Sequence, residues 1–137
     1  MITLTTGQVE RIFAHAYEAT PAECCGLIGG IGGHAKAIYR LSNIAIDVNV
    51  SYEAAPEDLF AAQREMRERG ESLLAIYHSH PRSDDPTPSE TDVRLAYYPQ
   101  AVYLIVGLAG SSPLMRAFRI SEREDRWEPV EYEIAGE

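Results

Sequence analysis

Two short, nearly continuous apolar runs narrow the folds that are open to this chain. Residues 73–77 and 101–108 contain no charged side chain. A strand with one wet face alternates polar and apolar residues, whereas a strand covered on both faces is apolar along its length. We therefore expect two central strands in a sheet that carries helices on both faces.

Three segments have the pattern of helices. Between Gly7 and Pro21, apolar residues recur at the spacing of one helical face: Val9, Ile12, Phe13, Ala16 and Tyr17. Pro56 is expected to open a second helix and Gly70 to close it, with the charged residues of this segment facing solvent. A short third helix is predicted over about 88–98, between the two apolar runs.

The remaining segments predict strands. Residues 27–28 and 35–41 form a predicted hairpin around a turn that takes in Gly29 to Gly33. A phosphate-binding loop is disfavoured there, because no Gly-Lys-Ser/Thr ending follows the glycines. In the C-terminal segment, polar and apolar residues alternate enough to predict two more strands, over 114–120 and 127–134.

The order helix, hairpin, helix, strand, helix, strands predicts an α/β layered fold with a mixed β-sheet flanked by helices. A chain of 137 residues with 45% hydrophobic content fits a single domain over residues 1–137. In such sheets ligands gather at strand ends, and the most polar strand end here is His78-Ser79-His80.

Composition argues against several kinds of partner. With 12 basic and 21 acidic residues the net charge is -9, which repels a phosphate backbone, so we expect no nucleic acid partner. No signal-peptide pattern and no run of about eighteen apolar residues occurs, so we expect no membrane association and a cytoplasmic location. The adjacent Cys24 and Cys25 are expected to stay reduced.

His78 and His80 are candidate metal ligands. If the strand over 73–77 continues to His80, its alternation points both imidazoles to one face and Ser79 to the other. Two convergent imidazoles suit one metal ion, but a pair of histidines that are merely hydrogen-bonded at a strand end has the same pattern. His15 and His34 are expected to be structural or exposed instead.

Asp92 is the candidate third ligand. Thr87 is predicted to cap the third helix, with Pro88 at its first position and Glu90 completing a capping box. That assignment leaves Ser89 and Asp92 on a common face of the first turn. Two histidines and one carboxylate leave a fourth tetrahedral position open, as in catalytic zinc sites. Ordinary helix-start composition remains an alternative for both residues.

Glu23 is the candidate proton carrier. Hydrolysis at such a site needs a group that takes a proton from water and returns it to the leaving group, and one carboxylate can do both. Thr20-Pro21-Ala22-Glu23 also fits a capping box, and from the residues alone the two interpretations are equally good.

Taken together, these elements resemble the JAMM (MPN+) metalloprotease motif. It combines a distant glutamate, His-x-His-Pro and Ser-x-x-Asp, which stand here as Glu23, His78-Ser79-His80-Pro81 and Ser89-Glu90-Thr91-Asp92. The resemblance implies a fold akin to cytidine deaminases, zinc (Zn2+) held by His78, His80 and Asp92, Glu23 as general acid/base, and Ser89 as a donor to the oxyanion. The loop between His80 and Ser89 is one residue longer than is usual in the family, which leaves Asp84 and Asp85 as substitute ligands.

The resemblance also implies a function. Short standalone members are prokaryotic and cleave the peptide or isopeptide bond after the C-terminal Gly-Gly of ubiquitin-like proteins. We therefore expect a peptidase that acts on a ubiquitin-like sulfur-carrier protein. It would either release cysteine from the carrier or remove the carrier from protein lysines. Assembly into a homodimer is left open. The alternative is a non-catalytic MPN-type scaffold that binds ubiquitin-like or assembly partners. The deaminase signature and the HExxH helix are both absent from the sequence.

Overall fold

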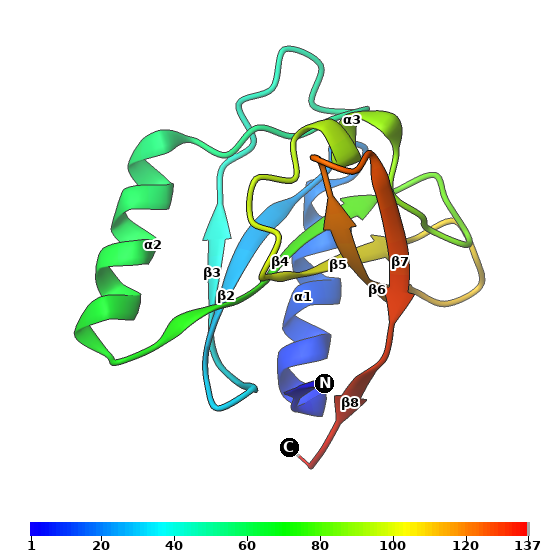
Figure 1. Cartoon of the computed structure of the whole chain (residues 1–137). Helices are drawn as coiled ribbons and strands as arrows, with labels where there is room; N and C mark the ends of the chain where they lie inside the picture. The colour runs from blue at the N-terminus through cyan, green and yellow to red at the C-terminus, as the bar shows by residue number, and fades with distance from the viewer. Residues whose placement is uncertain (137) are drawn as a thin grey trace.

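The computed structural model describes residues 1–136 and shows a mixed β-sheet with helices on both faces (Figure 1). Within these residues the elements are β1 (Ile2–Leu4), α1 (Thr6–Ala19), β2 (Cys25–Ile31), β3 (His34–Leu41), α2 (Pro56–Glu68), β4 (Ser72–His80), α3 (Glu90–Arg94), β5 (Val102–Gly107), β6 (Leu114–Ser121), β7 (Arg126–Val130) and β8 (Tyr132–Ile134). The predicted α/β fold class is confirmed.

The two apolar runs are the central strands β4 and β5, which pair in parallel as expected for buried neighbours. One face of this pair packs on α1, where Tyr77 and Leu104 are fully buried. The other face, with Ile76 and Ile105, packs on α2 and the segment around α3. None of the helices within residues 1–136 is long and apolar enough to cross a membrane.

The C-terminal segment joins the two edges of the sheet. Only Glu131 separates β7 from β8, yet β7 pairs with β6 at one edge and β8 pairs with β1 at the other. The sheet therefore curls around α1, as the red ribbon in Figure 1 shows. The predicted single strand over 127–134 is divided at this point, and the short β1 had no periodic pattern by which to predict it.

The glycine-rich turn is narrower than predicted. Gly29 and Gly30 belong to β2, and only Gly32 and Gly33 turn the chain, with φ of 59° and 82°. A Cβ atom on Gly29 would meet the Glu71 carboxylate, and one on Gly30 would meet backbone and side-chain atoms of its neighbours. Both glycines therefore make room for neighbouring atoms, and the pairing registers of β2 with β3 and β4 shift at this point of the strand.

The third helix is shorter than predicted, because it spans Glu90–Arg94 rather than 88–98. Beyond Arg94 the chain leaves the helix, so that Ala96 is buried and the backbone N–H of Tyr98 donates to the Tyr103 hydroxyl at 3.2 Å. The first two helices begin and end close to the predicted residues.

Gly26 in β2 gives a test of this packing. The ring of the fully buried Tyr77 lies where a Cβ atom of residue 26 would stand. Gly26→Ala should lower the free energy of unfolding by about 1–3 kcal/mol in urea denaturation, because overpacking forces buried neighbours to shift. Gly110→Ala, where a Cβ meets nothing closer than ordinary contact, is the matched control and should be near neutral. Equal stability of the two variants would contradict the packing described here.

Candidate metal centre

His78 and His80 lie at the end of β4 with their imidazoles on the same face of the sheet. The strand continues to His80, as the alternation required. Their Nε2 atoms are 3.2 Å apart, and His78 is fully buried while His80 is partly exposed. Tyr52, from the loop after β3, covers the His78 ring at 4.6 Å between centroids.

Asp92 brings a carboxylate to the same point from α3. Its Oδ2 atom is 3.1 Å from Nε2 of His78 and 3.0 Å from Nε2 of His80. The three atoms therefore form a nearly equilateral triangle. Ligands about 2.0 Å from a tetrahedral zinc ion stand about 3.3 Å from one another, so the triangle has the dimensions of three such ligands.

The start of α3 fixes the orientation of Asp92. Ser89 is the N-cap: its Oγ accepts from the backbone N–H of Asp92 at 3.0 Å, and Oδ2 of Asp92 accepts from the backbone N–H of Ser89 at 2.9 Å. The predicted cap by Thr87 and Glu90 is wrong, because Ser89 and Asp92 form the capping box two residues later. The same carboxylate oxygen of Asp92 thus caps the start of α3 and faces both histidines.

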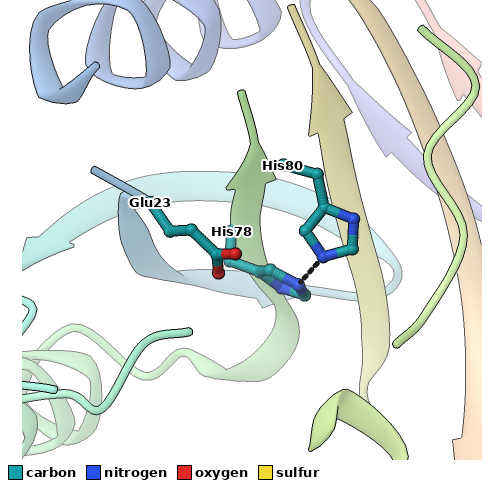
Figure 2. A group of neighbouring side chains, drawn as sticks. All are labelled: Glu23, His78 and His80. Atoms are coloured by element: carbon teal, nitrogen blue, oxygen red, sulfur yellow. Dashed lines mark hydrogen bonds between the residues drawn. The ribbon is translucent and has the colours of Figure 1, made fainter. Parts of the chain in front are cut away.

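Glu23 lies beside the histidines, just before β2 (Figure 2). Ligand atoms of Glu23, His78 and His80 all lie within 4.8 Å of one another. The side chain is buried, and its Oε1 has no hydrogen-bond partner among residues 1–136. The alternative role of Glu23 in a capping box is wrong, since a strand rather than a helix follows it.

Ser79 and Asn43 position Glu23, and neither was singled out for this from the sequence. Ser79 points away from the histidines, and its Oγ accepts from the backbone N–H of Cys24 at 2.9 Å. Asn43 contacts five backbone groups with its amide: the carbonyls of Glu23, Val48 and Ser51, and the N–H groups of Ala45 and Glu53. An isolated asparagine in a loop has no spacing that would reveal such a role.

The charges of the site are arranged around Asp92. Burial alone would raise the pKa of Asp92, but His78 and His80 hold it well below its usual range. Burial would likewise lower the pKa of His78, yet the Asp92 charge raises it. Burial raises the pKa of Glu23 to about 7, against the opposing charges of His78 and Arg82. The carboxylate of Asp92 therefore favours positive charge at the centre of the triangle.

The other sequence candidates contribute no atom to the triangle of His78, His80 and Asp92. Asp85 pairs with Arg116 at 2.9 Å, and Asp84 is exposed. Nδ1 of His15 lies 2.7 Å from the Tyr77 hydroxyl, which is a structural position on α1, and His34 is exposed at the start of β3. Cys24 and Cys25 are free and buried.

Two cavities flank the site. The smaller, about 310 Å³, is lined by Glu23, His80 and Ser89, together with Asn49, Val50, Pro81, Arg82 and Ser83. The larger, about 440 Å³, is lined mainly by apolar and tyrosine side chains, including Tyr52, Leu59, Leu95 and Tyr97. The polar groups that could carry chemistry face the smaller cavity.

The family follows from comparison with known proteins. The model of a family described as prokaryotic homologs of the JAB domain matches residues 5–121. The chain belongs to this family. The resemblance to standalone prokaryotic JAMM/MPN proteins is thereby confirmed.

Three relatives carry names of bond-cleaving enzymes. A desampylase of Haloferax volcanii is 36% identical over 110 residues, which cover 76% of this chain and 78% of the relative. A probable TtuB-protein conjugate cleaving protease of Thermus thermophilus is 33% identical over 119 residues, covering 87% and 76%. A CysO-cysteine peptidase of Mycobacterium tuberculosis is 27% identical over 132 residues, covering 95% and 90%. The chain is a hydrolase of this family.

Two solved structures share the fold. The protein DSY2949 from Desulfitobacterium hafniense is 35% identical with a TM-score of 0.87, covering 100% of this chain and 94% of that one. A structure described as a metalloprotease-like JAMM zinc site in the proteasome and signalosome has a TM-score of 0.62 at 19% identity, covering 98% of each chain. At that identity the second likeness concerns the fold alone.

Asn43→Ala tests how the loop over 44–54 is held against Glu23. The variant loses contacts to five backbone groups, so the free energy of unfolding should fall by about 1–3 kcal/mol and amide exchange in the loop should accelerate. Asn49→Ala, in the same loop but with no hydrogen bond from its side chain among residues 1–136, is the control and should change neither measurement. Unchanged exchange in Asn43→Ala would show that the loop is held by other contacts.

Proposed function

We propose that this chain is a zinc-dependent metallopeptidase that hydrolyses the amide bond after the C-terminal Gly-Gly of a ubiquitin-like sulfur-carrier protein. The observation that carries the proposal is the triangle of two imidazole nitrogens and one carboxylate oxygen, with sides of 3.0–3.2 Å. Beside it lies Oε1 of Glu23, which has no hydrogen-bond partner within the described residues 1–136. If His78 and His80 were held only by hydrogen bonds, nothing would explain why the Glu23 carboxylate is buried beside them without a partner for its Oε1 among residues 1–136.

The donor set fits zinc. His78, His80 and Asp92 would hold the ion, and two imidazoles with one carboxylate match the ligands of catalytic zinc sites. The negative charge of Asp92 stabilises a cation at this place, and the cap of α3 keeps its oxygen directed there. Zinc would supply Lewis acidity, lowering the pKa of water and polarising the substrate carbonyl.

Glu23 and Ser89 supply the remaining chemistry. The Glu23 carboxylate takes a proton from the attacking water and delivers it to the leaving nitrogen as the carbon–nitrogen bond breaks. Its burial and raised pKa, about 7, suit a group that must both accept and donate. The Ser89 hydroxyl accepts a bond from the Asp92 backbone, and its own hydrogen remains free to donate to the oxyanion, a contribution typically worth about 2.7–4 kcal/mol.

The proposed substrate class rests on the relatives and on the surface beside the site. The relatives are named desampylase, probable TtuB-protein conjugate cleaving protease and CysO-cysteine peptidase, and the last two names describe cleavage of a conjugate. A tail that ends in two glycines can approach a catalytic backbone closely, since it has no side chains there, and can add to it as an extended strand. The 440 Å³ apolar cavity beside Tyr52 offers the carrier a surface on the acyl side of the bond.

Cleavage assays test this proposal. The zinc-loaded protein is incubated with a small ubiquitin-like carrier whose C-terminal Gly-Gly is joined to cysteine, and with the same carrier joined to a lysine side chain. We expect release of a carrier ending in Gly-Gly from at least one substrate, detected by intact mass. Cleavage of neither, while an unrelated peptide is turned over, would refute the substrate class.

Variants separate metal binding from proton transfer within the same assay. Glu23→Gln should keep about one zinc per chain but lose turnover, because the amide cannot carry the proton, whereas Asp92→Asn should lose both. Asp84→Asn removes an equal charge from an exposed position and should keep both. Full activity of Glu23→Gln would overturn the role given to this residue.

A further inference from the structure

The 310 Å³ cavity lies next to Glu23, the residue to which the proposed function gives the protonation of the leaving group. A general acid must lie within hydrogen-bond reach of the nitrogen that it protonates. Glu23 lines this cavity and does not line the 440 Å³ one. If Glu23 protonates the leaving nitrogen, the leaving group therefore occupies the smaller cavity, and the side chains there decide which leaving groups are accepted.

Arg82 gives this cavity its positive charge. It stands two residues after His80, in the turn that follows β4, and lines the same cavity as Glu23 and Ser89. Within residues 1–136 its guanidinium makes no ion pair and no side-chain hydrogen bond, although other arginines of the chain do, such as Arg116 with Asp85 and Arg40 with Glu18. It is the arginine that lines this cavity, and its donors are available to a ligand.

A guanidinium selects for a particular chemical group. Its planar fork of N–H donors matches a carboxylate with two parallel hydrogen bonds, which are stronger than bonds between neutral groups. A single amino acid attached to the carrier through its α-nitrogen keeps a free α-carboxylate close to the scissile bond. A lysine within a protein, attached through its side chain, has its α-carboxyl in a neutral peptide bond and presents no such charge.

We propose that Arg82 binds the free α-carboxylate of the leaving group, so that the preferred substrate is a carrier extended by one amino acid rather than a carrier joined to a protein lysine. This inference rests on the proposed function and names its leaving group. In the reaction the water oxygen bonds to the carbonyl carbon and the bond to the α-nitrogen breaks. Glu23 transfers one proton from water to that nitrogen, and the amino acid leaves with its carboxylate unchanged.

Two matched substrates test the inference. One is a small ubiquitin-like carrier whose Gly-Gly is followed by a single alanine with a free carboxylate, and the other is the same protein with the alanine as its amide. The wild-type protein should cleave the acid with a kcat/KM at least about tenfold above that for the amide, as expected for a charge-assisted pair. Arg82→Gln should abolish this preference by slowing the acid alone, mainly through a higher KM.

Arg123→Gln is the matched control, because it removes the same charge from an exposed turn between β6 and β7, at the opposite end of the sheet from His80. It should leave the preference for the acid intact. Equal cleavage of acid and amide by the wild type, or an equal loss on both substrates in Arg82→Gln, would overturn the role of Arg82 while the proposed function stands. Cleavage of neither substrate by the wild type would count against the proposed function itself.

Discussion

The pleat of β4 determines where the groups of the site lie. Because successive side chains of a strand point to opposite faces, Tyr77 and Ser79 turn toward the face covered by α1, and His78 and His80 turn toward the face of α3. The Ser79 hydroxyl then accepts a hydrogen bond from the backbone N–H of Cys24, and this contact places the preceding residue, Glu23, next to the imidazoles. A shift of one residue in this strand would separate all of these groups at once.

The site also requires that the carboxylate of Asp92 be held in one orientation. The helix α3 has a single turn and little stability of its own, but its capping box uses the side chain that also faces the histidines. The contact that starts the helix therefore also orients Asp92. Asn43 has a comparable double use, because the contacts that shape the loop over 44–54 also hold the backbone of Glu23. The site is built from groups that local structure already fixes.

The sequence predicts those parts that depend on periodicity. The apolar runs predict the central strands, the alternation in β4 predicts that both histidines face one side, and Pro56 and Gly70 bound α2 correctly. The start of α3 is displaced by two residues, because Thr87 with Glu90 and Ser89 with Asp92 fit the same capping pattern equally well.

What depends on contacts between distant segments could not be predicted. Glu23 approaches the histidines because β2 pairs with β4, with Cys25 opposite His78, and no local pattern encodes that register. The resemblance to the JAMM motif, rather than the physics of the segment, singled out this glutamate. For the same reason the closure of the sheet by β8 and the part played by Asn43 emerge only from the structure.

X-ray absorption at the zinc edge of the zinc-loaded protein tests the central claim most directly. The account predicts a first coordination sphere of nitrogen and oxygen atoms at about 2.0–2.2 Å, with the outer-shell scattering of two imidazoles. Sulfur scatterers at about 2.3 Å would place the ion on Cys24 or Cys25 instead. A sphere without imidazole would likewise contradict the arrangement of His78, His80 and Asp92 as the metal ligands.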